Sequence, residues 1–390
     1  MYIRNNIAIA TTGLVSRLSK MSSKLPPNMI KFDRAMQIVY RYPTEASDES
    51  WTPPPASAGH KGRYLWTDAF GVLNFVTLFL TTSSPHYLGL ARALVDAVHS
   101  TLGRTRDGSS QLRNATADAP LAGGLRIGKE EAAGPDGDGQ YHHYLTLWMF
   151  ALNRLGAAAR DRRYNDLAVQ LAKAVHPAFV YNRAAARPRM YWKVSMDLSV
   201  PLVRSEGNLD PIDGFVVYRI LQESDGPGSK VLETEIDEYR RIVETKWRGY
   251  RSDDPLDLGM TMWTSHFFGS GLGAEKEEWS ASLLEAAKRD TANLFDRGHF
   301  NSNVRRRLAF REFGTVLGLR CGTEGARWDD MVKKIIDTWE STGVVPDPGA
   351  AKADAVINSE KDLVPITLVM YAAALNPASF RTGYHEQRAG

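Results

Sequence analysis

Apolar residues recur at three- and four-residue spacing along most of the 390-residue chain, which is the periodicity of α-helices. Runs of Val, Ile and Thr that alternate with polar residues are few, and no Asn-Gly or Asp-Gly turn joins two such runs. The sequence therefore predicts an all-α protein. The predicted helices are twelve in number and cover residues 29–41, 64–81, 86–103, 141–156, 162–175, 212–223, 232–247, 256–269, 276–296, 304–319, 327–342 and 362–375.

The predicted helices are of two kinds. Some are amphipathic with a charged face, and residues 233–247 are an example. Others are apolar nearly all round, such as residues 212–221, 256–268 and 363–375, and must be buried on every side. The two kinds alternate along the second half of the chain, which is the pattern expected for an inner and an outer ring of helices.

Six helical hairpins in two rings make an (α/α)6 toroid. The predicted hairpins start at residues 64, 141, 212, 256, 305 and 362, and this spacing is too uneven for a solenoid of fixed repeat length. We therefore expect one barrel domain at residues 29–376, between a basic flexible leader at 1–28 and a tail at 377–390. The leader has no acid and several basic residues, so a mitochondrial transit peptide is the alternative interpretation of this segment.

The composition restricts the class of protein. With 43% hydrophobic and 24% charged residues the chain is an ordinary globular protein. Its 48 basic and 45 acidic residues are too nearly balanced to favour nucleic acid, and no uncharged apolar stretch reaches the roughly 20 residues of a membrane span. The single Cys321 excludes internal disulfides and cysteine-built metal centres. We expect a cytoplasmic protein, or a mitochondrial one if the leader is a transit peptide, that acts on a small molecule; its oligomeric state stays open.

Two predicted connections, residues 104–140 and 176–211, are far longer than the two to eight residues usual between bundle helices. Long loops in a compact domain are often functional. In a toroid, all connections that enter the inner helices lie at one end of the barrel. We therefore expect a cleft at that end, lined by residues that precede or begin the inner helices.

Acid–base chemistry requires titratable side chains in this cleft, and the candidates are Asp68, Asp138, His142, His143 and Asp197. Asp68 follows Trp66 in the first turns of a buried helix, where low-dielectric surroundings raise the pKa of a carboxyl toward the working pH. A helix N-terminal acid is the alternative role for it. His142 and His143 are adjacent, about 100° apart on a helix, so only one of them faces the axis easily. Asp197 has no helix start to cap, which favours a catalytic role.

Substrate-binding candidates are aromatic and polar residues of the same segments: Trp66, Tyr141, Trp192, Asp210, Asp213, Trp263 and His266. Aromatic side chains can stack on the apolar face of a pyranose ring. Asp210 and Asp213 flank Pro211 at a helix start, so capping is the alternative for both. Two carboxylates could act across a glycosidic bond, and Asp68 and Asp197 are the predicted pair, with Asp138 or one of the two histidines as the third candidate.

Residues 253–257, Asp-Asp-Pro-Leu-Asp, match the DDxxD pattern with which terpene cyclases hold magnesium and a diphosphate. In those enzymes the acids lie on a helix, whereas Pro255 here marks a helix start and makes the acids caps. The chain has no nucleophile elbow, zinc-protease motif, phosphate-binding loop or dinucleotide loop. The sequence therefore predicts neither a metal nor a cofactor. Arg307 or Arg311, if turned inward, could hold a carboxylate or phosphate.

The alternating helices over residues 29–375, with Trp, Tyr, Asp and His at inner-helix starts, resemble the six-hairpin, (α/α)6-barrel glycosidase-like superfamily. That superfamily contains glycoside hydrolases, unsaturated uronyl hydrolases, sugar epimerases and polysaccharide lyases. The resemblance implies a carbohydrate-active enzyme of hydrolase, lyase or epimerase type. The same barrel occurs in terpene cyclases, so an isoprenoid cyclase, with or without magnesium at Asp253 and Asp254, is the first alternative. A barrel that binds without catalysis is the second.

Overall fold

The computed structural model describes residues 25–43, 51–55, 63–132, 134, 137–269, 276–345 and 363–383. The predicted leader therefore lies largely outside the described residues. The described helices are α2 (Pro27–Tyr40), α3 (Leu65–Thr82), α4 (Pro85–Leu102), α5 (His142–Ala159), α6 (Arg163–Phe179), α7 (Asp210–Asp225), α8 (Glu233–Lys246), α9 (Pro255–Gly269), α10 (Glu278–Asp296), α11 (Ala309–Gly322), α12 (Ala326–Ser341) and α13 (Val364–Leu375). The described strands are β1 (Gln140–Tyr141), β2 (Val180–Tyr181), β3 (Arg189–Met190) and β4 (Lys193–Val194).

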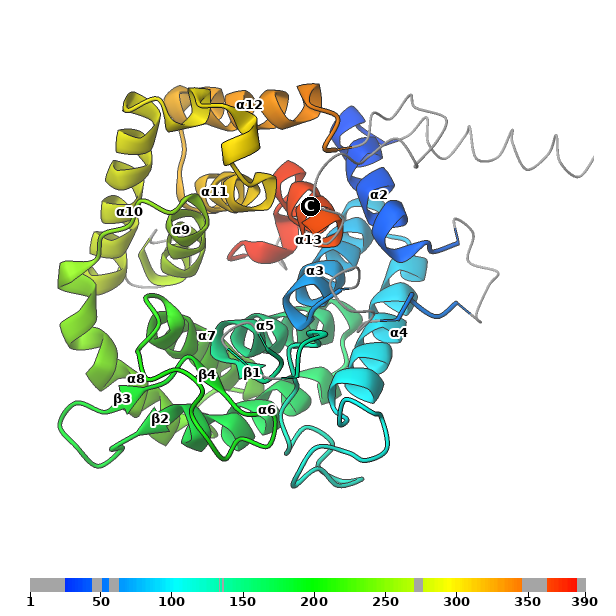
Figure 1. Ribbon diagram of the computed structural model, residues 1–390, viewed down its shortest axis with the longest axis vertical. Helices are drawn as coiled ribbons and strands as arrows, with labels where there is room; N and C mark the ends of the chain where they lie inside the picture. The colour runs from blue at the N-terminus through cyan, green and yellow to red at the C-terminus, as the bar shows by residue number, and fades with distance from the viewer. Residues whose placement is uncertain are drawn as a thin grey trace, which may run out of the picture.

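The helices form two concentric rings (Figure 1). The odd-numbered helices α3 to α13 make the inner ring and the even-numbered helices α2 to α12 surround them. The ring closes because α13, the last helix, packs against both α2 and α3. Every residue of α3 from Leu65 to Phe79 is buried, as an apolar inner helix requires. The predicted all-α (α/α)6 toroid is confirmed.

One predicted helix start lies several residues away from the observed one. The helix expected at residues 304–319 begins at Ala309, and residues 304–306 form a separate 3-10 turn. The cause is Arg307, whose Nε donates to Oε1 of Glu312 at 2.6 Å and whose Nη1 donates to the carbonyl oxygen of Phe300 at 3.0 Å. These contacts hold the backbone at Arg307 in an extended conformation.

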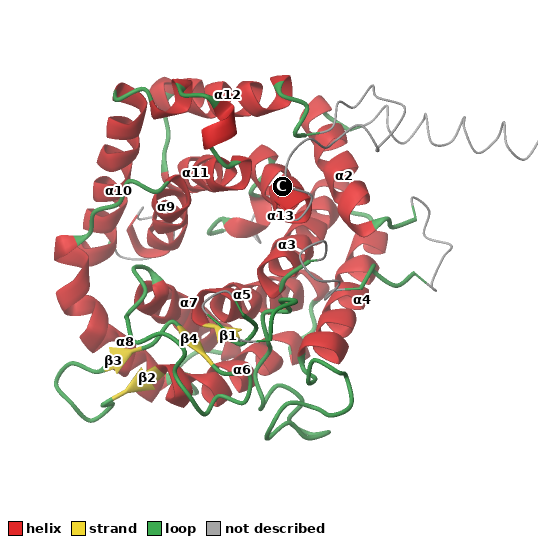
Figure 2. Cartoon of the chain, viewed as in Figure 1, coloured by secondary structure: helices red, strands yellow, loops and turns green. Residues whose placement is uncertain are grey.

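The four short strands lie in or beside the two long loops, and Figure 2 shows them on the side of the ring formed by α5 to α8. β1 pairs antiparallel with β4, so that Gln140 faces Val194 and Tyr141 faces Lys193. β2 pairs antiparallel with β3. The β1–β4 pair ties the connection before α5 to the connection before α7, and this brings Tyr141 next to Trp192, with ring centroids 4.7 Å apart.

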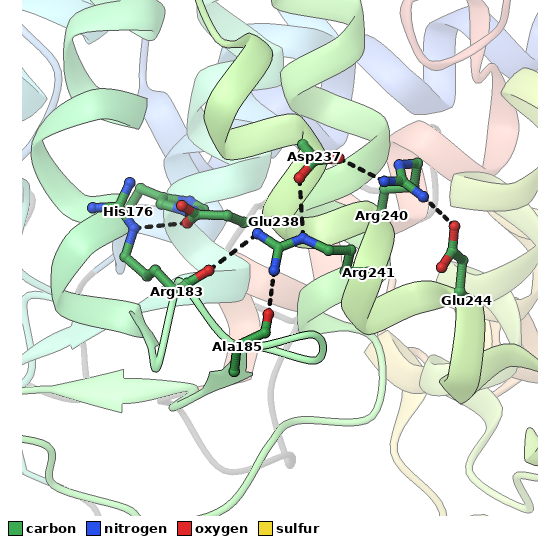
Figure 3. Close-up of polar contacts among 8 residues, drawn as sticks. All are labelled: His176, Arg183, Ala185, Asp237, Glu238, Arg240, Arg241 and Glu244. Carbon is green, nitrogen blue, oxygen red and sulfur yellow. Dashed lines mark hydrogen bonds and ion pairs between the residues drawn. The ribbon is translucent and has the colours of Figure 1, made fainter.

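The turn between β2 and β3 is anchored to the outer helix α8 by a charge network (Figure 3). One carboxylate oxygen of Glu238, Oε2, lies 2.7 Å from Nε of Arg183 and 2.8 Å from Nε2 of His176. Arg241 donates to the carbonyl oxygen of Arg183 at 3.1 Å. Burial lowers the pKa of His176 to about 4, although Glu238 opposes the shift, so His176 is neutral and the network is fixed by Arg183 at neutral pH.

Residues 377–380, predicted as part of a tail, pack against the inner helices, whereas Arg381 and Gly383 are exposed (Figure 1). Phe380 is fully buried, with its ring centroid 5.2 Å from that of Phe70 on α3. Its carbonyl oxygen accepts a hydrogen bond from Nε1 of Trp263 on α9 at 3.1 Å. Residues that the sequence assigned to a tail therefore complete the core.

Among the described residues, α3 is the one helix that is long and apolar enough to cross a membrane by length and composition. In the barrel, 83% of it is buried against the rest of the chain. Burial on all sides explains why an inner-ring helix has the hydropathy of a membrane span.

Candidate functional site

A cavity of about 290 Å³ lies at the end of the barrel where the inner helices begin. Five of the predicted site residues are in its wall: Trp66, Tyr141, His143, Trp192 and Asp210. Asp254, Asp257 and Arg311 join them from the starts of α9 and α11. A volume near the lower end of the range for ligand sites suits a small substrate.

His143, one residue into α5, is held by a chain of hydrogen bonds that runs across three inner helices. Its Nδ1 lies 2.7 Å from Oδ2 of Asp213 on α7, and Oδ1 of Asp213 accepts a hydrogen bond from Oγ1 of Thr264 on α9 at 2.7 Å. Asp213 is 1% exposed. Because a carboxylate only accepts, Nδ1 carries the proton and donates, which leaves Nε2 of this pocket-lining ring as the free base.

The charges around the cavity favour the protonated form of His143. Burial acts to lower the pKa of His143. The hydrogen bond to Asp213 and the charges of Asp213, Asp210 and Asp257 together outweigh burial, and the pKa is raised above the ordinary value of 6.5. A raised pKa makes the neutral form of His143 a stronger base.

Asp210, the first residue of α7, lines the cavity, and its Oδ1 has no hydrogen-bond partner in the part of the chain that the structure describes. It is 6% exposed, and its one recorded polar contact in the described part of the chain is His142, with Nδ1 3.5 Å from Oδ1. A buried carboxylate that lacks donors is costly, so a ligand that donates to it is the natural complement.

Asp257 is a second acid of the wall, and the sequence analysis did not propose it as a site residue. Burial raises its pKa, although hydrogen bonds from Ser252, Asn208 and Tyr250 act against the shift. Asn208 donates to Oδ2 at 2.8 Å and the hydroxyl of Tyr250 donates to the same oxygen at 3.1 Å. The DDxxD pattern contained this residue as its last acid, which was the signal available in the sequence.

Aromatic rings form one wall of the cavity. Tyr141 stacks on Tyr144 with centroids 4.7 Å apart and planes at 18°. Trp66 contacts His143 edge-on, with centroids 4.1 Å apart. Together with Trp192, these rings provide flat apolar surfaces beside polar groups, which is the combination that stacks on a sugar ring.

Of the three DDxxD acids, Asp254 caps α9 as the sequence analysis expected. Oδ1 of Asp254 accepts hydrogen bonds from the backbone nitrogen of Leu256 at 2.8 Å and that of Asp257 at 3.1 Å. Its Oδ2 binds Arg311, which does turn toward the cavity. Asp253 is exposed and is not part of the cavity wall. In the described residues, no three His, Cys, Asp or Glu side chains gather as a metal site would require.

Comparison with solved structures finds a cellobiose 2-epimerase from Spirochaeta thermophila DSM 6192, with a TM-score of 0.52. The match covers 83% of this chain and 88% of that chain. This chain has the six-hairpin (α/α)6-barrel fold. The two sequences are 14% identical, and neither a protein-family profile nor a curated protein matches this one. At this identity the match shows the fold and not the reaction.

Asp68 lies on the opposite side of its helix from the cavity. Residues two apart on a helix point about 200° apart, so Asp68 faces away when Trp66 faces the cavity. Its Oδ1 accepts from Nε of Arg63 at 2.6 Å and from the hydroxyl of Tyr40, on the outer helix α2, at 3.1 Å. Burial raises its pKa despite Arg63. The buried environment predicted for a catalytic acid is present, but Asp68 is held there by an ion pair with Arg63 and a hydrogen bond from the outer helix α2.

Asp138 and Asp197 stabilise loops. Oδ2 of Asp138 accepts from Nη1 of Arg126 at 3.0 Å, and its Oδ1 accepts from the backbone nitrogen of Gly128 at 2.9 Å. Asp197 lies exposed at the tip of the hairpin that follows β4. Hydrogen bonds from Ser195 and Ser199 lower its pKa to about 2. Neither carboxylate is in the cavity wall.

His142, Trp263 and His266 are buried in the barrel interior, outside the cavity wall. Nε2 of His142 lies 2.6 Å from the hydroxyl of Tyr239. His266 donates from Nδ1 to the carbonyl oxygen of Trp263, and its Nε2 accepts from the backbone nitrogen of Thr382 at 3.1 Å. Burial lowers the pKa of His266 to about 3, so it is a neutral structural residue that holds the C-terminal segment.

Acidification should therefore destabilise the barrel in part through His266. Its folded pKa lies below the unfolded value of 6.5, so its contribution is complete above pH 6.5 and is lost as the pH falls toward 3. At pH 5 the loss relative to pH 7 should be about 2 kcal/mol in the free energy of unfolding. Denaturant unfolding at the two pH values measures it. His266→Asn, whose amide still donates to Trp263, should show a smaller loss between these pH values; equal losses would contradict the assignment.

Proposed function

We propose that the protein is a carbohydrate-active enzyme of the epimerase type, which transfers a proton at a carbon of a small uncharged sugar. One observation carries the proposal: His143 presents a free base nitrogen to an aromatic-lined cavity while Asp213 and Thr264 fix its ring. The fold is that of a sugar epimerase, and it supports the same class of substrate.

The proposed reaction follows from the groups in the wall. Nε2 of His143 removes a proton from the carbon next to the carbonyl of an open-chain sugar. The electron pair of the broken C–H bond forms a C=C bond as the carbonyl oxygen takes up negative charge, and Asp257 in its protonated form, which burial favours, donates a proton to that oxygen. The enol hydroxyl then returns its proton to Asp257, a water molecule held by Asp210 gives a proton to the other face of the carbon, and the hydroxide left behind takes the proton from His143, which gives the epimer.

The charge of the wall supports an uncharged sugar. The charged side chains with the largest effects on the pKa of His143 are carboxylates, and Arg311 is already paired with Asp254. A sugar acid or sugar phosphate would meet the carboxylate of Asp210 at close range, and like charges in a low-dielectric site repel strongly. Hydroxyl groups, which donate hydrogen bonds, complement the same carboxylate.

Deuterium exchange tests the proposal. The protein is incubated in D2O with neutral aldoses and with reducing disaccharides, and the products are analysed by NMR and mass spectrometry. Epimerisation through a carbon-bound proton gives the 2-epimer with one deuterium at that carbon. The matched uronic acids, which differ by one carboxylate, should react much more slowly. Release of a monosaccharide without deuterium at carbon would show hydrolysis instead, and faster reaction of the acids would contradict the assigned charge preference.

A further inference from the structure

Two polar atoms beside the cavity are buried without a hydrogen bond. Nδ1 of His142 and Oδ1 of Asp210 are 3.5 Å apart, and neither bonds another group in the described part of the chain. The cation that faces Asp210, Lys246 at the end of α8, forms no ion pair with it among the same residues. Unsatisfied buried polar atoms are rare in native proteins, so two of them side by side require an explanation.

The other ring nitrogen of His142, Nε2, has a hydrogen-bond partner. Its Nε2 lies 2.6 Å from the hydroxyl of Tyr239, which is fully buried on the outer helix α8. The ring of Tyr239 reaches past the inner helix because α7 has a glycine there: a Cβ at Gly214 would lie 2.4 Å from Cζ of Tyr239. A glycine inside a helix lowers its stability, so the close approach of Tyr239 is obtained at a cost.

One tautomer of His142 satisfies both of its nitrogen contacts. Neutral imidazole has one donor and one acceptor nitrogen. If the hydroxyl of Tyr239 donates to Nε2, the proton of His142 is on Nδ1 and points at Oδ1 of Asp210. The second oxygen of Asp210, Oδ2, lies against Gly207 in the cavity wall.

We propose that His142 is a positioning residue: Tyr239 fixes its tautomer, its Nδ1–H closes onto Oδ1 of Asp210 when a substrate binds, and Oδ2 of Asp210 is thereby aimed at the substrate. The inference rests on the proposed function for the identity of that substrate. Hydrogen bonds in catalytic sites are often long in the free enzyme and shorten in the complex, which accounts for the 3.5 Å separation. α7 thus presents Asp213 to His143 and Asp210 to His142, one turn apart.

Tyr239→Phe tests the inference because it removes the hydroxyl and keeps the ring. We expect kcat for the sugar to fall about tenfold with KM changed less than about twofold. The matched control is Tyr371→Phe, which also removes a buried hydroxyl, one that donates to Oε1 of Glu340 at 2.6 Å. The control should keep wild-type kcat. Equal kcat in wild type and Tyr239→Phe, or equal losses in both variants, would overturn the inference.

A measurement without turnover separates this inference from the proposed function. In protein with 15N-labelled histidine, the nitrogen shifts of His142 should report a proton on Nδ1 in the wild type and a mixture of tautomers in Tyr239→Phe. A proton on Nε2 in the wild type, or identical spectra in both proteins, would refute positioning even if sugars react. If no sugar reacts, the proposed function fails, and the spectra still show whether Tyr239 sets the tautomer of His142. Should Tyr239→Phe not fold, His142→Asn, whose amide replaces the Nδ1 donor, should keep kcat within about threefold, whereas His142→Leu should lose it.

Discussion

His143→Asn is expected to lower kcat by about 10³-fold while leaving the melting temperature nearly unchanged. The asparagine amide can still donate to Asp213 from about the position of Nδ1, so the buried carboxylate keeps its partner. What the variant lacks is Nε2, the nitrogen that the proposal assigns to proton transfer. Steady-state kinetics on the sugar identified by deuterium exchange, together with thermal melts, measure both effects.

The control for this variant is His86→Asn, the same change at a histidine whose Nε2 contacts the carbonyl oxygen of Pro43 outside the cavity. It should react at the wild-type rate.

A second expectation concerns pH: the base must be neutral, so kcat/KM should rise as the pH increases through the raised pKa of His143. Asp213→Asn removes the largest favourable contribution to that pKa and should move this limb to lower pH. Wild-type kcat in His143→Asn would contradict the proposed mechanism, because the variant lacks Nε2.

The sequence predicted the architecture closely because burial determines it. A helix such as α3, buried from Leu65 to Phe79, has no polar face, and the alternation of such helices with amphipathic ones is visible in the chain. The start of α11 could not be obtained in this way. It depends on Arg307 binding Glu312 and Phe300, and no local periodicity records a tertiary contact of that kind.

For the site, the sequence indicated the correct end of the barrel but not the direction of each side chain. Residues at inner-helix starts share that end, which is why Trp66, His143 and Asp210 meet at one cavity. Asp68 starts an inner helix too, yet its partner is Tyr40, 28 positions earlier on another helix. Rotation about the helix axis decides between cavity and interface, and it is set by the packing of the whole ring.

Gly318→Ala should give a large loss of stability for the addition of a single methyl group. A Cβ at Gly318 would lie 2.1 Å from the carbonyl oxygen of Gly259, and one at Gly259 would lie 2.1 Å from that of Gly314. α9 and α11 therefore pack backbone to backbone, and a backbone atom cannot move aside as a flexible side chain can. We expect a loss of about 3 kcal/mol in the free energy of unfolding, measured by denaturant titration.

The control is the same substitution where space is free. Gly89 lies on an exposed part of the outer helix α4, and nothing lies within 4 Å of the Cβ that Gly89→Ala would add. There alanine should stabilise by up to about 1 kcal/mol, because glycine weakens a helix interior. Both variants add one methyl group to a helix, and they differ in the atoms that this group contacts. A loss of unfolding free energy in Gly318→Ala and a gain in Gly89→Ala would therefore show that the contact between α9 and α11 requires the glycines. If both variants were stabilised, α9 and α11 would have to lie farther apart, and Asp257 and Arg311, which these helices bring to the cavity, would not share its wall.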